Sequence, residues 1–600
     1  MFAQFPRFSQ SDRISPTLTA HSVGMSKRKS EEPHDSLTSG SPVSKKARVE
    51  DVIDESLPLQ QQGNGIIDER SSGTVVDNDD VEEEEEDDDG GKAGNFLHKQ
   101  KTPAQGYSDL YLDTIHRSVL DFDFEKLCSV SLSNINVYAC LVCGRYFQGR
   151  GPKSHAYFHA LDEDHHVYIN METKKVYVLP EGYEVQNKSL EDIKYVVDPR
   201  FSQDEVMKLD KVPVECTDLS NKRYRPGYIG MNNIKANDYL NVVVQTLAHI
   251  PPMRNFFLLH QFPSNSAQLA VRLSTLVRKI WNPKAFRNHV SPHELIQEIA
   301  LRSSKRFNLT QQSDPVDFLA WFLNQLHVGL GGSKTKPGSS VVQKTFQGRL
   351  RIETQAITAR SEASGDRLRF EESSEIQTRV TPFMILTLDL PPVPLFRDSV
   401  ESKNIIPQVA LTTLLQKYNG YQASEKAEQR LRHRLLHPLP PYLIFHVKRF
   451  SSNKFVSERN PTIVTFPSPR NLDLTSLVEP NPAIHDPHEP LLYDLVSNIV
   501  LDTTTGGGGE ESNAADAANK AVSGSSERIH WKVQVRDKAA TGVQTLPEWR
   551  EIQDLYVERA EAETLFTRES YLMVWERRGK LKPAANGLGA PATTRGKQKA

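Results

Sequence analysis

The stretch from residue 230 to residue 245 places the strongest constraint on the fold of this chain. Its first part is polar and rich in asparagine, and it continues directly into an apolar run from Tyr239 to Leu247. A loop that passes into a helix in this way presents one side chain at the helix N-terminus, where free backbone N–H groups converge. Enzymes place nucleophiles there, because the position lowers the pKa of a thiol. The residue at this junction is Asp238, and no cysteine lies near it.

The length of 600 residues predicts two or three folded units. The net charge of -3 gives no general attraction to nucleic acid or membranes. No apolar run reaches the roughly 18 residues of a membrane span, and the N-terminus lacks the apolar region of a secretory signal. The four cysteines are too few for a disulfide framework and fit a reducing compartment. We therefore expect a soluble intracellular protein without a membrane partner.

Residues 1–104 are rich in Ser, Pro, Gly, Asp and Glu and show no apolar periodicity, which predicts a disordered tail. Basic clusters at 27–29 and 45–48 have the arrangement of a bipartite nuclear-import signal, and the alternative is a plain solvated tail. The acidic run at 79–89 is most simply a solubilising spacer, with a contact for basic proteins as the alternative. We expect nuclear localisation, and a second disordered tail at residues 581–600.

A candidate metal site begins at Cys140 and Cys143, whose spacing lets one tight turn direct two thiolates at a single ion. Mixed thiolate and imidazole ligands suit zinc. The alternative, two buried thiols and several surface histidines, is disfavoured because cysteine is so scarce elsewhere in the chain. The histidines that could complete the site are His155, His159, His165 and His166.

This region resembles the zinc-finger domain of ubiquitin proteases, whose pattern includes C-L-x-C-G, G-R-Y and H-A-x-x-H-x5-H. The resemblance implies a small α/β domain over residues 105–210. Fuller members carry a second zinc set, which would begin at Cys128, but Ser131 replaces the second cysteine of that pair. One zinc is therefore expected. This zinc would be structural, because four protein ligands leave no open position for water. The implied ligands are Cys140, Cys143, His159 and His165, with His155 and His166 in reserve.

In some relatives this domain grips the free C-terminal tail of ubiquitin. Arg145 and Tyr146 would line part of such a pocket. The alternative is a docking module for another protein or ribonucleoprotein.

The stretch at 230–245 resembles the cysteine box of ubiquitin-specific proteases, G-L-x-N-x-G-N-T-C-Y-x-N-x-x-L-Q. Asp238 stands at the nucleophile position, and the segments 312–326 and 441–450 resemble a further helix and a further strand of the family. The resemblance covers residues 220–580 and implies an α+β, papain-like ubiquitin-specific-protease fold, preceded by the zinc finger and the disordered tail. The matching positions of the box are Asn233, Asn237, Tyr239, Asn241 and Gln245.

Helical patterning dominates from Tyr239 to Leu330, and one helix is expected to begin with Ser291 as its N-cap. Strand patterns dominate the second half. No C-x-x-C pair occurs between residues 217 and 600, so the finger subdomain of the family is either shortened or holds together without metal. The Gly- and Ala-rich insertion at 503–526 predicts a disordered loop.

The catalytic parts of a cysteine protease are a thiolate, a histidine base, a group that orients it and an oxyanion donor. Asn233 occupies the oxyanion-donor position, and Gln553 stands where the orienting acid should be. His530 aligns as a surviving base, but an equally gapped alignment places Ser526 or Glu527 there.

A carboxylate is a poor nucleophile toward an amide, so Asp238 predicts a pseudo-protease rather than an enzyme. Metal-assisted hydrolysis on Asp238 and His530 would need a third ligand that the sequence does not identify. Instead, we expect Asp238 to cap the helix N-terminus, which is worth roughly 1 kcal/mol.

The basic tail, the single-zinc finger and the phrase Asn-Asn-Ile-Lys-Ala-Asn-Asp-Tyr at 232–239 resemble an inactive, splicing-associated subfamily of these proteases. Membership implies a nuclear, non-catalytic scaffold that supports the spliceosomal tri-snRNP through protein–protein contacts. The alternatives are a module that binds ubiquitin or a ubiquitin-like protein without cleaving it, and an active isopeptidase. No basic stripe with interleaved aromatic residues is visible, which favours protein partners over direct contact with RNA.

Overall fold

The computed structural model describes residues 110–263, 265–361, 368–392, 406–426, 429–452, 457–466, 468–486, 488–504, 528–539 and 548–579. The tails predicted at 1–104 and 581–600 lie outside the described residues, and so do Ser526 and Glu527. Thr503 and Thr504 of the predicted insertion belong to a strand, and the rest of the insertion also lies outside them. In the described part of the chain, no helix is long and apolar enough to cross a membrane.

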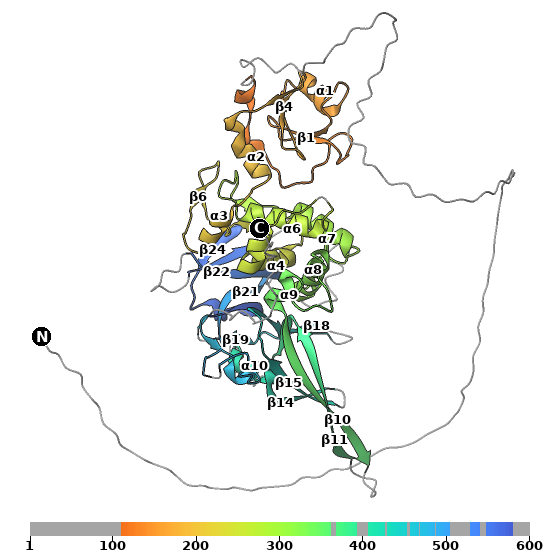
Figure 1. The fold of residues 1–600 in the computed structure, drawn as a ribbon, viewed down its shortest axis with the longest axis vertical. Helices are drawn as coiled ribbons and strands as arrows, with labels where there is room; N and C mark the ends of the chain where they lie inside the picture. The colour runs from red at the N-terminus through yellow and green to blue at the C-terminus, as the bar shows by residue number, and fades with distance from the viewer. Residues whose placement is uncertain are drawn as a thin grey trace, which may run out of the picture. The chain divides into compact units, whose positions relative to one another are not determined.

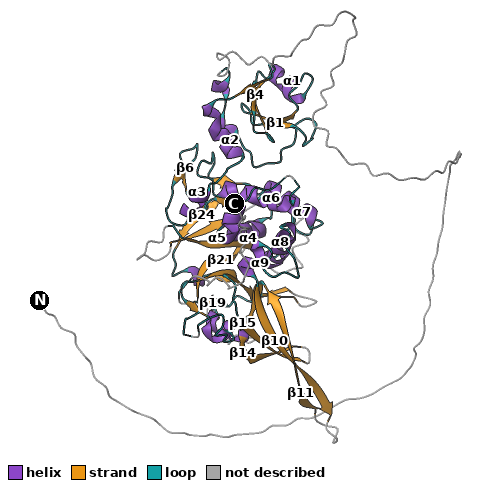
Figure 2. Cartoon of the chain, viewed as in Figure 1, coloured by secondary structure: helices purple, strands orange, loops and turns teal. Residues whose placement is uncertain are grey.

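The zinc-finger region contains a five-stranded antiparallel sheet in the order β2-β1-β3-β4-β5 (Figures 1 and 2). Helix α1 begins after Ser154, whose hydroxyl accepts a hydrogen bond from the N–H of Tyr157 at 3.4 Å. The small α/β domain is therefore confirmed. Its strands are β1 (Val137–Cys140), β2 (Tyr146–Gln148), β3 (Val167–Asn170), β4 (Val176–Val178) and β5 (Tyr183–Val185). Its helices are η1 (Leu112–Thr114), η2 (Arg117–Val119), α1 (His155–Asp162), η3 (Lys188–Leu190) and α2 (Glu191–Val197). Helix α3 (Gln203–Lys208) follows them and packs in the core of the large domain.

The helical part of the large domain confirms the patterning predicted between Tyr239 and Leu330. Its central helix α4 is buried along its whole length, and it packs against α8 and against strand β22. The prediction that Ser291 caps a helix is wrong: residues 289–290 pair as a short strand, so Pro292 is the N-cap. The helices are α4 (Asp238–Ala248), α5 (Pro251–Leu259), α6 (Gln268–Ile280), α7 (His293–Arg302), α8 (Pro315–Gly329) and α9 (Val341–Phe346).

The main sheet runs in the order β12-β16-β25-β21-β22-β23-β24, with β20 paired to β21. Only the β12–β16 pair is parallel among its described pairings. The sheet brings β22 and β23 next to the N-terminal end of α4, and thereby positions the site described below. Its strands are β12 (Ile385–Asp389), β16 (Tyr442–Lys448), β20 (Leu472–Asp473), β21 (Leu492–Thr504), β22 (Arg528–Asp537), β23 (Glu548–Gln553), β24 (Tyr556–Ala560) and β25 (Glu569–Arg577).

A separate four-stranded sheet has the order β11-β10-β15-β14 and forms the finger subdomain (Figure 1). Its strands β10 and β11 are 14 and 16 residues long. Among the described residues no group of possible metal ligands lies in it. Its strands are β10 (Gly348–Ser361), β11 (Leu368–Phe383), β14 (Asn419–Lys426) and β15 (Gln429–Leu436).

The remaining elements are short. The strand pair that matters for the site is β8 with β9, because β8 leads into the loop before α4. The strands are β6 (Cys216–Thr217), β7 (Arg223–Tyr224), β8 (Gly230–Met231), β9 (His289–Val290), β13 (Gln408–Ala410), β17 (Phe450–Ser452), β18 (Ser457–Arg459) and β19 (Ile463–Thr465). The helices are α10 (Leu411–Leu415), η4 (Gln416–Tyr418), η5 (Thr475–Leu477) and η6 (Leu565–Thr567).

Candidate metal centre and the Asp238 site

The four predicted metal ligands come from three neighbouring pieces of the zinc-finger domain. Cys140 ends strand β1 and Cys143 lies in the turn that follows, while His159 is on α1 and His165 lies between α1 and β3. The turn closes through the N–H of Gly144, which donates to the carbonyl of Cys140 at 2.9 Å. Gly144 has a φ of 76°, a backbone conformation that favours glycine.

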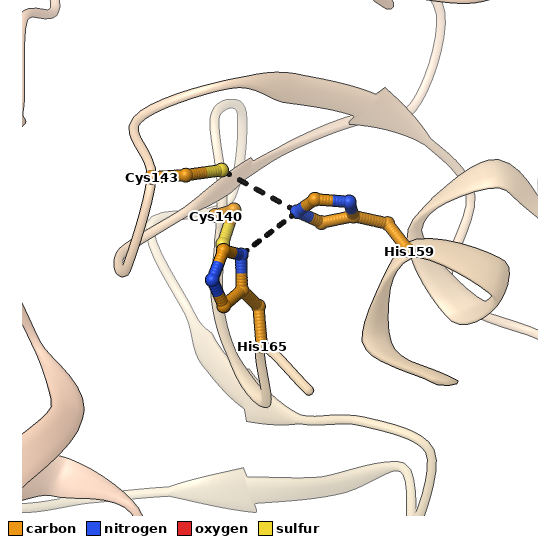
Figure 3. Close-up of side chains that lie close together, drawn as sticks. All are labelled: Cys140, Cys143, His159 and His165. Atoms are coloured by element: carbon orange, nitrogen blue, oxygen red, sulfur yellow. Dashed lines mark hydrogen bonds between the residues drawn. The ribbon is translucent and has the colours of Figure 1, made fainter. Parts of the chain in front are cut away.

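The donor atoms of these four residues all lie within 4.8 Å of one another (Figure 3). The Sγ of Cys143 is 3.3 Å from the Nε2 of His159, which is 3.1 Å from the Nδ1 of His165. A hydrogen bond with the Cys140 thiol lowers the pKa of Cys143 to about 4, and the same contact raises that of Cys140. Two thiol sulfurs and two imidazole nitrogens are a donor set that fits tetrahedral zinc.

The reserve ligands do not join this group. Both ring nitrogens of His166 have partners elsewhere, the carbonyl of Leu179 at 2.7 Å and the carboxylate of Asp164 at 2.8 Å. His155 is the first residue of α1 and lies outside the group. Cys128 is buried, and its Sγ accepts a hydrogen bond from the N–H of Ser131 at 3.4 Å.

Asp238 is the first residue of α4, and its carboxylate accepts hydrogen bonds from three donors. One carboxylate oxygen accepts from the N–H of Tyr239 at 2.9 Å. The other accepts from the Nε2 of Gln312 at 2.7 Å and from the N–H of Trp531 at 3.2 Å. These donors belong to α4, to the loop before α8 and to strand β22. The carboxylate therefore joins the helical part of the domain to the main sheet.

The predicted N-cap role of Asp238 is wrong by one residue. The N-cap is Asn237, whose side chain accepts no capping hydrogen bond from the backbone N–H groups of the first turn. Its amide oxygen accepts from the N–H of Ile234 at 2.7 Å, and its amide nitrogen donates to Asn232 and Asn241. Asn237 is thus occupied with closing the loop.

Asn233 and Tyr239 have structural roles that their hydrogen bonds define. The Oδ1 of Asn233 accepts from the N–H of Asn237 at 3.1 Å, and its Nδ2 donates to the Oδ2 of Asp554 at 3.3 Å. Tyr239 donates from its hydroxyl to the carbonyl of Asn308 at 3.1 Å. The amide that would serve as an oxyanion donor therefore already has a carboxylate partner.

The other predicted catalytic positions lie on neighbouring strands. His530 is on β22, directly before Trp531, and Gln553 is the last residue of β23. The acid that faces the loop is Asp554, the next residue along the chain. Burial raises the pKa of Asp554, the hydrogen bond from Asn233 opposes this shift, and the charge of Asp238 adds to it. The charge of His530 also acts on that pKa and lowers it.

Sequence reasoning missed three parts of this site, namely Gln312, Asp554 and the N–H of Trp531. Asp554 had a signal, since residues 549–554 resemble the W-x-x-F-D-D motif of the family and Asp554 matches its second acid. The only signal at Gln312 is that it begins the segment 312–326, which resembles a helix of the family. The described residues contain no metal-ligand group at Asp238 and His530, so the third ligand required for metal-assisted hydrolysis is not found there.

Comparison with known proteins places this geometry in a family. Residues 229–575 match the family described as ubiquitin carboxyl-terminal hydrolase, and residues 128–190 match the zinc finger in ubiquitin-hydrolases and other proteins. Since the first match spans more than half of the chain, the protein belongs to the ubiquitin carboxyl-terminal hydrolase family and carries the family's zinc finger.

Within this family the chain is similar to several known proteins, and the names of two of the three given below refer to splicing. It is 49% identical to "Probable mRNA-splicing protein ubp10" of Schizosaccharomyces pombe, over 78% of this chain and 88% of the relative. It is 44% identical to human "Ubiquitin carboxyl-terminal hydrolase 39", over 78% and 80% of the two chains. A solved structure, described as an essential yeast splicing factor, matches with a TM-score of 0.59 and 31% identity, over 78% of this chain and all of that one.

Proposed function

We propose that this protein is a nuclear, non-catalytic component of pre-mRNA splicing that supports assembly or stability of the spliceosomal tri-snRNP through protein–protein contacts. The splicing names of relatives that match most of the chain support this role. The observation that carries its non-catalytic part is Asp238, which stands at the nucleophile position and accepts hydrogen bonds from Tyr239, Gln312 and Trp531.

The chemistry of this site argues against peptide hydrolysis. Attack by a carboxylate on an amide would form an anhydride, and a carboxylate held by three donors is less nucleophilic than a free one. Loss of the nucleophile in a serine protease costs about 10⁶ in kcat, or roughly 8 kcal/mol. The vestigial positions are Asn233, Asp238, His530 and Gln553, and in this proposal none of them is catalytic.

The proposal includes one structural zinc ion, held by Cys140, Cys143, His159 and His165. The donor set and its convergence support this assignment. Zinc would cross-link β1, α1 and the start of β3, and four protein ligands would leave it no coordination site for a substrate.

One observation argues against the alternative function, ubiquitin binding without cleavage. Tyr146 was predicted to line a pocket for the ubiquitin tail, but its ring is buried and its hydroxyl donates to the carbonyl of Asp121 at 2.9 Å. Arg145 is exposed. Calorimetric titration with ubiquitin tests this alternative, and we expect no binding up to millimolar concentration.

Purification of the tagged full chain from nuclear extract at low salt tests the splicing assignment. We expect tri-snRNP proteins in the eluate, and their absence would contradict the proposal. The same preparation should not react with ubiquitin vinyl sulfone, because no cysteine lies at the nucleophile position. Covalent labelling would overturn the pseudo-protease assignment.

A further inference from the structure

Five arginines from two strands far apart in sequence lie on one face of the finger sheet. The register of β10 with β15 places Arg351 opposite Arg434, Glu353 opposite Arg432 and Gln355 opposite Arg430. The same register places Arg349 opposite Leu436. Because side chains alternate between the two faces of a sheet, the arginines share one face. We call this surface the arginine face: Arg349, Arg351, Arg430, Arg432 and Arg434.

The alternate residues of these strands show which way the arginine face points. Leu350 and Leu435 are buried in the core beside the main sheet, and Ile352 packs against that core. The arginines on the other face therefore point away from this core. The sequence shows the two halves of the arginine face as alternating arginines at 349–351 and 430–434, but only the pairing of β10 with β15 places them side by side.

The charges on this face do not balance. Glu353 and Glu479 pair with Arg351 at 3.2 and 2.6 Å, and Glu425 pairs with Arg430 at 3.5 Å. Among the described residues, no carboxylate forms an ion pair with Arg432 or Arg434. Arg351 and Arg434 also stand directly opposite each other, an arrangement of like charges that destabilises a sheet. An external carboxylate would relieve this repulsion.

One corner of the face is built around Arg434. Gly420 has a φ of +81°, and a Cβ added to it would lie 2.7 Å from the Cδ of Arg434, so only glycine leaves room for this side chain. The guanidinium lies over the ring of Tyr421, 5.3 Å from its centroid. Tyr421 is itself 75% exposed, and the Nε of Arg434 is buried without a hydrogen-bond partner. The result is a fixed guanidinium with unused donor capacity.

Apolar side chains flank the arginines on strand β11. The register places Val380 opposite Arg351 and Ile376 opposite Gln355, so both lie on the same face. They are 53% and 46% exposed. Arginine, tyrosine and exposed aliphatic groups together are typical of protein–protein interfaces. The glutamates on this face would repel a phosphate backbone, and the exposed aliphatic side chains are suited to burial against apolar side chains of a protein, so the composition favours a protein over RNA.

We propose that the arginine face binds an acidic segment of a protein partner. Carboxylates of that segment would pair with Arg432 and Arg434, because guanidinium and carboxylate groups match in a two-pronged geometry. Aliphatic side chains of the segment would cover Ile376 and Val380. This inference rests on the proposed function, since it names the kind of contact through which the scaffold would act.

Fluorescence anisotropy with the full chain tests the proposal. The probe is a labelled synthetic peptide of alternating Glu and Val, and a labelled oligouridylate of similar length serves as the second arm. We expect Arg432→Glu with Arg434→Glu to weaken peptide binding about tenfold or more, the effect of losing charge-assisted hydrogen bonds. Replacement of both by Lys should weaken it less, because charge is kept and the planar fork is lost.

The matched control is Arg379→Glu. Arg379 is exposed on the same sheet, but it lies opposite Ile352 and hence on the other face. This variant should bind the peptide as the wild-type chain does. Equal loss in the control and in the double variant would overturn the proposal, and so would oligouridylate binding that depends on Arg432 and Arg434 while peptide binding does not. Circular dichroism checks that each variant is folded.

The nuclear-extract purification separates failure of this inference from failure of the proposed function. If the wild-type chain recovers tri-snRNP proteins but does not bind the acidic peptide, the arginine face is wrong and the splicing role stands. If the wild-type chain recovers none of them, the proposed function fails whatever the peptide does.

Discussion

The metal centre and the Asp238 site are both built from a turn that leads into ordered structure, yet their side chains face different surroundings. The donor atoms of Cys140, Cys143, His159 and His165 converge on one another. The carboxylate of Asp238 instead meets donors supplied by the protein itself. The first arrangement is suited to receiving an ion, whereas the second is already satisfied.

This difference shows that a motif can keep its structural role after its chemical role has gone. The loop before α4 is closed by hydrogen bonds among Asn232, Asn233, Asn237 and Asn241. None of these bonds needs a cysteine at position 238. The match to the family's cysteine box therefore indicates a loop of the same structure. It does not indicate the role of residue 238, which follows from the contacts of Asp238 itself.

The largest effect that distinguishes the two regions is expected at the metal centre. Cys143→Ser should abolish zinc binding and unfold the zinc-finger domain, because structural zinc contributes on the order of 10 kcal/mol to such domains. Zinc content by atomic absorption and backbone NMR spectra check this. Cys128→Ser is the control, since Cys128 lies outside the ligand group. A chain that loses no zinc in Cys143→Ser would contradict the assigned ligand set.

The convergence of Cys140, Cys143, His159 and His165 could be predicted from the sequence, because these residues lie close together along the chain and their spacing has a geometric meaning. The contacts of Asp238 could not. Gln312 is 74 residues away and Trp531 is 293 residues away, and Trp531 contributes only its backbone N–H, which leaves no trace in residue type. Asp554 lay one residue beyond the position that the motif singled out.

The fold could be predicted only in part for the same reason, namely that local sequence patterns do not show which distant residues meet. Helical periodicity located α4 to α8, and the strand at 441–450 was recognised as β16. The pairing of β10 with β15 joins residues about eighty positions apart, so the sequence alone does not show that the arginines of the two strands share one face. Local patterns give elements, whereas the side chains that meet across elements depend on register.

The next largest effect is expected at Asp238. Asp238→Ala should lower the free energy of unfolding by about 3 kcal/mol, because the buried N–H groups of Tyr239 and Trp531 lose a charged acceptor and the exposed side chain of Gln312 loses a partner. Urea unfolding measures this. The control is Asp317→Ala, which removes an exposed ion pair with Arg306 and should cost less than about 1 kcal/mol. Equal costs in the two variants would show that the Asp238 carboxylate has no structural role.

A smaller effect is expected at Gly230, which lies at the start of the segment before α4 and close to Leu555 in the turn after β23. A Cβ on Gly230 would lie 2.7 to 2.9 Å from backbone atoms of Leu555, so Gly230→Ala should destabilise the chain by about 2 kcal/mol. Gly151 has no atom within 4 Å of an added Cβ, and Gly151→Ala should leave stability nearly unchanged. Thermal unfolding of the two variants compares them, and a neutral Gly230→Ala would show that the close approach is not rigid.

The smallest effect is expected when the missing catalytic groups are put back. The double variant Asp238→Cys with Gln553→Asp restores the thiol and the orienting acid, yet we expect no labelling by ubiquitin vinyl sulfone. Asn233 still donates to Asp554, and Gln312 still donates to the carbonyl of Ile529 at 3.0 Å, which keeps the loop before α8 joined to β22 beside the thiol.

Gel mobility and intact mass measure this labelling, with an active member of the family as the positive control. A general thiol reagent establishes whether the new cysteine is reachable by a small molecule. Reaction with that reagent but not with the ubiquitin probe would place the block at the approach of the ubiquitin tail. Labelling by the probe would mean that these two substitutions are sufficient to make the site reactive. It would also mean that the hydrogen bond from Gln312 to the carbonyl of Ile529 breaks readily.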